Sequence, residues 1–187
     1  MVLRMSLNKN VAAFIIILAV VCFGPIAWAQ KIYLTPADAL KLMFKNSSTV
    51  SEAKQVMTPE LRQKLEKENR IPFPKNTYMF YVGKSGEKID GYALIDEEIG
   101  KVEPITFVTL ISPEGIIEQV EIMVYRESHG GEVAQSRFLN QFRGKTLVGD
   151  LRLNQGIRSI TGATLSAKAL VTGSRRALIL WQTFYGK

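Results

Sequence analysis

Small and hydroxyl-bearing residues are concentrated in one segment, which reads Ser159-Ile160-Thr161-Gly162-Ala163-Thr164-Leu165-Ser166. It directly precedes a predicted helix, and a helix start presents unpaired backbone N–H groups and the positive end of the helix dipole. A phosphate group binds well at such a position. The small residues let a bulky group approach the backbone, and the four hydroxyls can donate to phosphate oxygens. These hydroxyls can instead cap the helix, which is the simpler interpretation from residue types alone.

A second chemically equipped segment lies upstream and reads Tyr125-Arg126-Glu127-Ser128-His129-Gly130-Gly131-Glu132-Val133. From residue type, Glu127 is either a solvated charge at a strand end or a ligand-binding group. His129 is the only histidine and Cys22 the only cysteine, so the chain cannot assemble an ordinary zinc site from imidazoles and thiolates. We predict no metal site and no catalytic residue set.

The first 29 residues have the pattern of a signal peptide. Arg4 and Lys9 precede an apolar run over residues 11–24, and Ala27-Trp28-Ala29 offers small residues at both positions that a signal peptidase reads. We expect cleavage after Ala29 and export of the chain. The alternative is an uncleaved N-terminal anchor, because the stretch 11–29 is just long enough to span a bilayer.

Cleavage would change the redox options of the chain. The net charge would fall from +7 to +5 with the loss of Arg4 and Lys9, and Cys22 would be lost too. No disulfide, iron–sulfur cluster or haem attachment pair could then form. Any redox chemistry of the exported chain must therefore depend on a cofactor bound in another way.

Positive charge along the chain is scattered. The one short basic cluster, Arg175-Arg176, lies on the predicted last helix and is interpreted as part of a solvated surface. We predict no nucleic-acid partner.

Residues 30–74 are predicted to form two short helices. Thr35-Pro36 and Thr58-Pro59 each combine an N-capping residue with proline at the first helical position. The segment is too small and polar to bury a core of its own, so we expect these helices to cover the main domain.

Residues 75–187 change to strand-like periodicity. Four strands are predicted, over 77–82, 91–95, 105–111 and 116–125, with Pro113-Glu114-Gly115 as a turn that indicates an antiparallel hairpin. Two helices follow, over 132–142 and from about Leu165 to Phe184. Gly173 inside the last helix indicates close packing or a loosely packed position. The predicted class is α+β: an antiparallel sheet packed by C-terminal helices, preceded by a short helical segment.

The segment Thr161-Gly162-Ala163-Thr164 resembles the flavinylation motif of the FMN-binding domain family. That family includes the flavin-carrying subunits of sodium-pumping NADH:quinone oxidoreductase and of Rnf complexes, and small exported relatives. The segment from Tyr125 to Val133 is similar to the family's Glu-Thr/Ser and glycine segment, and the similarity extends over about 91–180. The domain plan that follows is residues 1–29 as signal peptide or anchor, 30–74 as helical segment, and 75–187 as FMN-binding domain.

The resemblance implies site residues. FMN would be attached through its phosphate to Thr164 by a flavin transferase that uses FAD. The phosphate would be held by the motif and helix start, at Thr161, Gly162, Ala163, Thr164, Leu165 and Ser166. Glu127 and Ser128 would bond polar edges of the flavin ring, and Gly130 and Gly131 would let the chain pass close to it. His129 is expected to be a hydrogen-bonding residue there.

One position departs from the family pattern. The family usually has an acid six residues before the modified threonine, where this chain has Arg158. If the transferase needs that acid, FMN would be held non-covalently or attached by a variant transferase. In either case Arg158 could pair with the phosphate.

The resemblance implies an exported electron carrier, periplasmic or on the outer face of the cytoplasmic membrane. Its redox partners would be membrane quinol or flavin subunits, or cytochromes. Two alternatives remain open: an FMN-dependent extracytoplasmic reductase, and a flavin-free accessory module in which the motif is only a helix cap. An electron-transfer role is preferred to that of a stand-alone enzyme because no substrate-binding constellation is visible.

Overall fold

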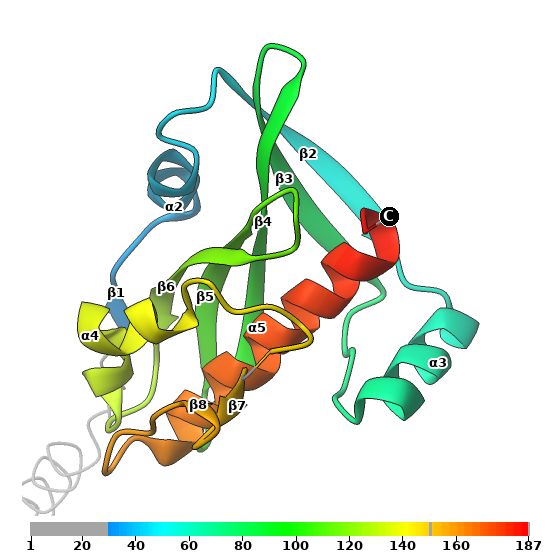
Figure 1. Ribbon diagram of the computed structural model, residues 1–187. Coiled ribbons are helices and arrows are strands. Elements are labelled where there is room, and N and C mark those ends of the chain that lie inside the picture. Colours follow the sequence, from blue (N-terminus) through cyan, green and yellow to red (C-terminus); the bar gives the residue numbers. More distant parts are fainter. Residues whose placement is uncertain (1–29, 150, 187) are drawn as a thin grey trace, which may run out of the picture.

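A six-stranded antiparallel sheet forms the centre of the computed structural model, which describes residues 30–149 and 151–186 (Figure 1). The strand order is β1-β6-β5-β4-β3-β2. The strands are β1 (Lys31–Ile32), β2 (Thr49–Val56), β3 (Thr77–Ser85), β4 (Lys88–Ile99), β5 (Pro104–Ile111) and β6 (Ile117–Tyr125). The predicted signal peptide lies outside the described residues.

The four predicted strands correspond to β3, β4, β5 and β6, and the predicted hairpin joins β5 to β6. The α+β class with an antiparallel sheet is confirmed. Sequence patterns did not predict β2, which pairs with β3 over its whole length, from Thr49 opposite Lys84 to Val56 opposite Thr77. Its residues are mostly exposed, so β2 lacks the apolar alternation that indicates a strand.

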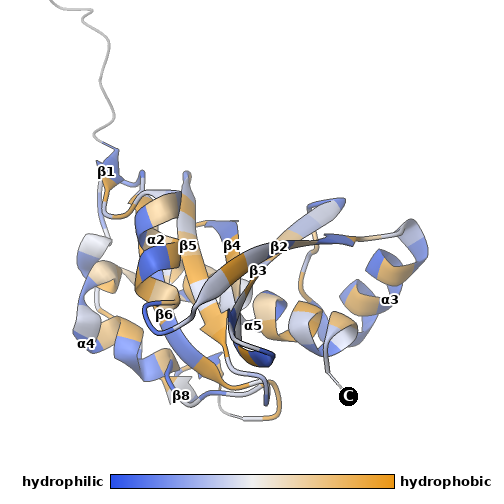
Figure 2. Cartoon of the chain, turned by 90° about the horizontal axis from the view of Figure 1, so that it is seen from above, coloured by the Kyte–Doolittle hydropathy of each residue, from blue (hydrophilic) through white to orange (hydrophobic). Residues whose placement is uncertain are grey.

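Helices cover both faces of the sheet, as the view from above shows (Figure 2). The long helix α5 (Thr164–Phe184) packs on the face that carries Leu94 and Phe107. The opposite face, with Ala93 and Val108, packs against α2 (Pro36–Met43). Neighbouring residues of one strand thus serve two separate cores, as the alternation of side chains across a sheet requires.

Both N-terminal helices begin where the sequence predicts. Thr35 caps α2 by accepting the N–H of Asp38 at 3.2 Å. Thr58 caps α3 (Pro59–Asn69) by accepting the N–H of Leu61, also at 3.2 Å. Each is followed by proline, whose missing N–H costs nothing at a helix start.

The predicted helix over 132–142 is divided into three short pieces. They are η1 (Gly131–Ala134), α4 (Ser136–Leu139) and η2 (Asn140–Phe142). The expected apolar face is present, since Phe138 and Phe142 are buried and their rings meet edge to face at 5.7 Å. Burial of these two rings, rather than helical propensity, fixes the segment.

Close packing at Gly173 fixes the middle of α5 on the sheet. A Cβ atom at this position would lie 2.1 Å from Cζ of Phe107, a distance that no real contact shows. The glycine therefore lets the helix approach β5, in agreement with the first of the two sequence interpretations. Trp181 is buried further along α5, as predicted for a core residue.

Arg176 corrects the prediction of a solvated basic cluster. Its side chain is 0% exposed, whereas Arg175 is half-buried. The guanidinium pairs with Asp96 at 2.8 Å and with Glu98, both on β4, and Nε donates to the Pro72 carbonyl at 2.8 Å. Burial disfavours the charge, but the two carboxylates outweigh it and raise the pKa of Arg176.

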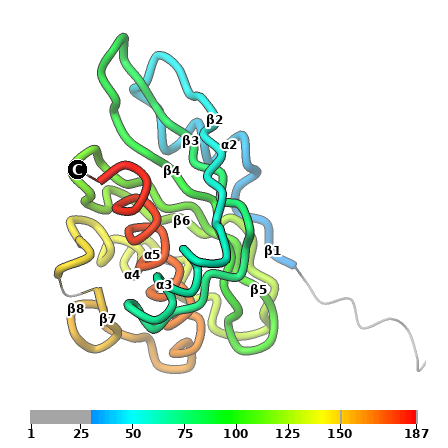
Figure 3. The backbone as a smooth tube through the Cα atoms, turned by 90° about the vertical axis from the view of Figure 1, so that its right-hand side faces the viewer, coloured from blue at the N-terminus to red at the C-terminus, as the bar shows by residue number. Residues whose placement is uncertain are grey.

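Lys75 completes the ionic cluster, with Nζ 2.7 Å from the other Asp96 oxygen. The cluster links α5, β4 and the segment that leads from α3 into the sheet, which lie side by side in Figure 3. Over the part of the chain that the structure describes, no helix has the length and apolarity needed to cross a membrane.

Replacing Arg176 by methionine should destabilise the protein by about 3–5 kcal/mol, because Asp96 and Glu98 would lose their partner in a buried setting. Arg175→Met, one residue away on the same helix, removes the same charge and should cost less than about 1 kcal/mol. Urea unfolding followed by circular dichroism measures both. Equal losses of unfolding free energy in the two variants would show that the buried ion cluster stabilises the protein no more than Arg175 does.

Candidate functional site

Two segments far apart in the sequence meet at the start of α5. The Tyr125 hydroxyl, at the end of β6, lies 2.8 Å from Oγ of Ser166 and donates to the His129 carbonyl at 2.6 Å. A phenol has one proton, so Ser166 must be the donor in the other bond. Burial raises the pKa of Tyr125, which keeps the phenol protonated and the bond network intact.

Gly130 allows this close approach. Its φ is +84°, a left-handed conformation that favours glycine. A Cβ atom there would lie 2.8 Å from the Tyr125 hydroxyl and 2.9 Å from Oγ of Ser166. Gly130, the first of the two glycines in the Tyr125–Val133 segment, therefore allows this segment to pack against the helix start.

The start of α5 lacks the cap that α2 and α3 have. The N-cap residue is Ala163, and no side chain accepts a hydrogen bond from the first turn. Ala167 is the first residue of this helix start to donate back along it, to the Ala163 carbonyl at 2.9 Å. The interpretation of the motif hydroxyls as a simple helix cap is therefore wrong for the described structure.

The uncapped turn is open to a ligand. Within the described ranges, the N–H groups of Thr164, Leu165 and Ser166 have no hydrogen-bond partner, and the first turn carries no acidic residue. Gly162 has a φ of +83° and nothing within 4 Å of where a Cβ would be. These features suit an anion that approaches the helix end.

The motif side chains divide into accessible and buried ones. Thr161, Gly162 and Thr164 are exposed, and Leu165 is 48% exposed beside them. Ala163 is buried under the turn. Ser166 is buried too, and its hydroxyl is engaged with Tyr125, so this hydroxyl supports the site and only the backbone N–H of Ser166 is left for a phosphate.

Sequence analysis missed the residue that holds the approach to the motif. The Gln141 side chain accepts the backbone N–H of Arg158 at 2.8 Å and donates to the Arg158 carbonyl at 3.3 Å. This two-way amide contact anchors the strand-like segment before the motif to η2. The Arg158 side chain itself is exposed. An isolated glutamine carries no sequence signal for such a role.

Glu127 is directed to the turn between β4 and β5. Its Oε1 accepts the backbone N–H groups of Lys101, Val102 at 2.7 Å and Glu103 at 3.1 Å. Partial burial would raise the pKa of Glu127, but these hydrogen bonds outweigh it and the pKa is lowered. Glu127 thus holds a neighbouring loop, and one of its oxygens is already occupied.

The remaining predicted residues lie on the same segment. Ser128 and His129 are exposed, and Oγ of Ser128 lies 2.8 Å from Nδ1 of His129. Gly131 begins η1 and lines a hollow of about 280 Å³ with Tyr33 and Glu132. The structure therefore brings the 125–131 segment to the helix start through Gly130, one of the two glycines expected near the flavin, and through Tyr125, which lies outside the predicted site.

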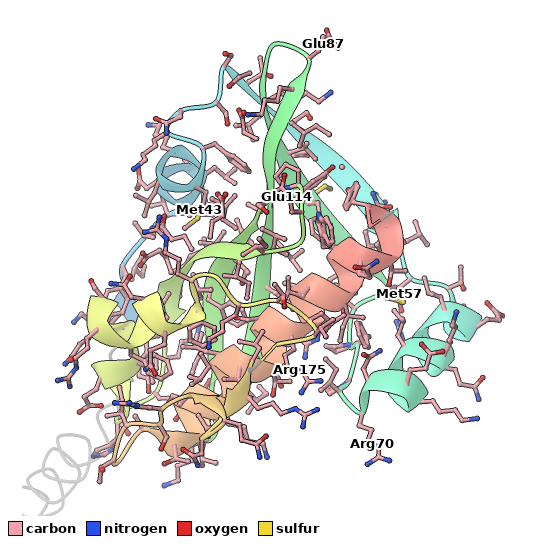
Figure 4. The ribbon with its side chains drawn as sticks, in the orientation of Figure 1. Met43, Met57, Arg70, Glu87, Glu114 and Arg175 are labelled. Atoms are coloured by element: carbon pink, nitrogen blue, oxygen red, sulfur yellow. The ribbon has the colours of Figure 1, made fainter. Side chains whose placement is uncertain are left out.

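A larger cavity lies elsewhere in the molecule. It has a volume of about 850 Å³ and is lined by the end of α2, the β5–β6 turn and η2, between the labelled Met43 and Glu114 of Figure 4. No residue of the Ser159–Ser166 motif lines it. Among residues 30–149 and 151–186, no group of three or more possible metal ligands is found, so the described residues offer no candidate metal centre.

Comparisons with known proteins give a matching domain model and two similar subunits. Residues 100–179 match the model of the FMN-binding domain, a range that contains both Glu127 and Thr164. A subunit of the Na(+)-translocating ferredoxin:NAD(+) oxidoreductase complex of Acetobacterium woodii is 27% identical over 130 residues, which cover 64% of this chain and 63% of that protein. A subunit of the proton-translocating ferredoxin:NAD(+) oxidoreductase complex of Clostridium ljungdahlii is 27% identical over 114 residues, covering 57% and 62%.

The chain spans less than two thirds of the length of either relative. The match confirms the predicted resemblance and FMN as the cofactor. The described residues fit this group, because the uncapped start of α5 offers N–H donors and an accessible hydroxyl at Thr164 to a phosphate.

Gly130→Ala should reduce stability by about 2–4 kcal/mol, since it adds overpacking against Tyr125 and Ser166 to the strain of a left-handed alanine. Gly144→Ala is the matched control: its φ is +78° but nothing lies within 4 Å. It should be destabilised only by the strain of a left-handed alanine, about 1–2 kcal/mol. Thermal unfolding of both variants checks this, and equal losses would contradict close packing at Gly130.

Glu127→Gln should destabilise the protein by about 1 kcal/mol near neutral pH, because an amide oxygen accepts the three N–H groups more weakly than a carboxylate. The folded-state pKa of Glu127 is below its ordinary value of 4.5. Its contribution is therefore present above that value and is lost as the pH falls through the lower folded-state pKa. Urea unfolding at about pH 7 and about pH 3 should show a smaller difference from wild type at the lower pH.

Proposed function

We propose that this chain, whose residues 100–179 form an FMN-binding domain, is an exported electron carrier that holds FMN through a phosphoester to Thr164. The observation that carries this proposal is the start of α5: an exposed threonine hydroxyl on the first residue of a helix whose first-turn N–H groups lack a cap. Helices α2 and α3 use a threonine side chain for that purpose. At α5 the Thr164 hydroxyl does not cap the helix and stays exposed, where it can form a phosphoester.

The phosphate would be held by the backbone at the helix start. The N–H groups of Thr164, Leu165 and Ser166 point along the helix axis, where the positive end of the dipole favours an anion. Gly162 leaves the approach open, and Thr161 adds a hydroxyl. Arg158 is exposed directly after the small strand β8 (Gly156–Ile157) and would add a positive charge to the phosphate environment.

Attachment would be made by a flavin transferase, as the family resemblance implies. Thr164 Oγ would form a bond to the phosphorus of the FMN half of FAD, the bond between the two phosphates would break, and AMP would leave. The hydroxyl proton would pass to a base of the transferase. The exposure of Thr164 supports this, because the hydroxyl must enter the active site of another protein.

The ring would lie against the residues that meet the helix start. Glu127, Ser128 and Gly131 are the proposed neighbours, and Leu165 offers an apolar contact. Bound FMN supplies one- and two-electron redox chemistry, while the protein sets its potential through hydrogen bonds and charge. Tyr125 and Ser166 would position the two segments relative to each other.

The redox partners are inferred from the chain's relatives and its N-terminal pattern. The two relatives are named as subunits of ion-translocating oxidoreductase complexes. We propose that this chain works outside the cytoplasmic membrane and exchanges electrons with membrane quinol or flavin subunits, or with cytochromes. Residues 30–74 would belong to the same unit, because they supply β1 and β2 to its sheet.

Arg158 supports one alternative to covalent attachment. It stands where the family usually has an acid, six residues before the threonine, so a transferase that reads this acid would act poorly. FMN would then be held by the same helix start without a covalent bond.

Coexpression of the exported chain with a flavin transferase tests the proposal. Wild type should gain the mass of one FMN less one water and show flavin fluorescence in a denaturing gel, because the phosphoester survives unfolding. Thr164→Val should gain neither. Thr161→Ser is the control, since it changes the same motif but keeps the hydroxyl at its first position, and should be labelled like wild type.

Labelling of Thr164→Val would place the attachment elsewhere and contradict the assignment. An unmodified wild type that purifies yellow would replace the phosphoester by non-covalent binding, with Arg158 as the position to change next. A colourless, unmodified wild type would contradict the carrier function.

A further inference from the structure

The strand β2 forms one edge of the sheet. It pairs with β3 on one side, and no other described element pairs with its outer side (Figures 1 and 3). Eight residues long, it is a substantial edge, whereas β1 at the opposite edge has only two residues. An open edge of this length presents a row of free backbone donors and acceptors.

The register shows which residues face outward. The Met57 N–H donates to the Asn76 carbonyl at 2.9 Å, in line with the ladder in which Val56 lies opposite Thr77. Backbone groups alternate between the two sides of a strand. Odd-numbered residues of β2 therefore bond to β3, and the even-numbered ones direct their N–H and C=O groups to the open edge.

The even-numbered residues form a sequence that is complementary to itself. They are Val50, Glu52, Lys54 and Val56, all exposed and all on one face of the sheet. Read backwards, the series is valine, lysine, glutamate, valine. An antiparallel copy centred on Ala53 therefore places Glu52 opposite Lys54 twice and Val50 opposite Val56 twice.

Neighbouring registers lack this complementarity. A pairing centred on residue 52 places the two glutamates opposite each other, and one centred on residue 54 does the same with the two lysines. Like charges directly opposite are destabilising, whereas opposite charges and apolar pairs are stabilising. Charge thus selects the register centred on Ala53, in which four directly opposed pairs form about eight backbone hydrogen bonds.

A shallow apolar hollow adjoins the same face of β2. It has a volume of about 370 Å³ and is lined by α2 residues including Leu40, by Phe44 and Tyr81, and by Val50 and Glu52 of β2 itself. In the register centred on Ala53, Val56 of the second copy lies next to Val50, at the border of this hollow. Val50 and Val56 are 43% and 59% exposed in the single chain, so pairing would cover apolar surface.

We propose that β2 is a self-association edge, through which two copies of this chain join their sheets antiparallel about Ala53. The occupant is a second copy because the strand's charges and apolar residues complement their own reversed order. A lysine on an edge strand also occurs as protection against pairing. Protection alone, however, does not require a glutamate and two valines at the mirrored positions.

Sedimentation velocity of the exported protein over a concentration series tests this inference. Wild type should show a monomer–dimer equilibrium. Glu52→Lys places lysines opposite each other, and Lys54→Glu does the same with glutamates, so each should weaken the dimer at least about tenfold. Lys31→Glu, an equal charge reversal on β1 at the other edge, should leave the dimer unchanged. Thermal unfolding of each variant checks that the fold is intact.

Two combinations give a sharper result. The double variant Glu52→Lys/Lys54→Glu restores opposite charges in the same register and should dimerise like wild type. A mixture of the two single variants should form a heterodimer, because each chain then carries one sign at both positions. A monomeric wild type at all concentrations, or loss of the dimer in the double variant, would overturn the proposal. The result does not depend on flavin loading, so it is separable from the proposed function.

Discussion

The buried ion cluster of Arg176 sets the position of α5, and most of the site depends on that position. A guanidinium that is fully removed from water is tolerated only with its charge and donors satisfied, which Asp96, Glu98 and the Pro72 carbonyl achieve together. These partners come from β4 and from the segment before β3, so the helix cannot slide along or rotate on the sheet without breaking them. Phe107 beneath Gly173 adds a steric limit to the same approach.

Because the middle of α5 is fixed on the sheet, the position of its first turn is fixed as well. The start of α5 is held against the end of β6 by the Tyr125–Ser166 bond, and Gly130 makes room for it. On the other side, Gln141 anchors the backbone of Arg158. The motif between these two anchors carries no cap, and this leaves donors and an exposed hydroxyl on a rigid support. Preorganised donors of this kind bind an anion without the entropy loss of ordering them first.

Sequence patterns predicted the elements with strong local signals. The Thr-Pro starts of α2 and α3, the alternating strand β6 and the apolar stripe of α5 are all present. Sequence patterns did not predict features that depend on tertiary contacts. The strand β2 is polar and exposed, and it is a strand because β3 offers it backbone partners. Arg176 looks like its neighbour Arg175 in sequence, and only the carboxylates across the interface distinguish them.

By itself the sequence determined the class of fold, the motif at Thr164 and the likeness to an FMN-binding domain, because these depend on periodicity and on residues that are adjacent in the chain. Only the tertiary structure decided that the motif is not a helix cap, that Ser166 turns inward to Tyr125, and that Glu127 holds the turn at residues 101–103. The physical reason is that hydrogen-bond partners and burial are set by segments that meet only when the sheet and α5 come together, and no local pattern encodes them.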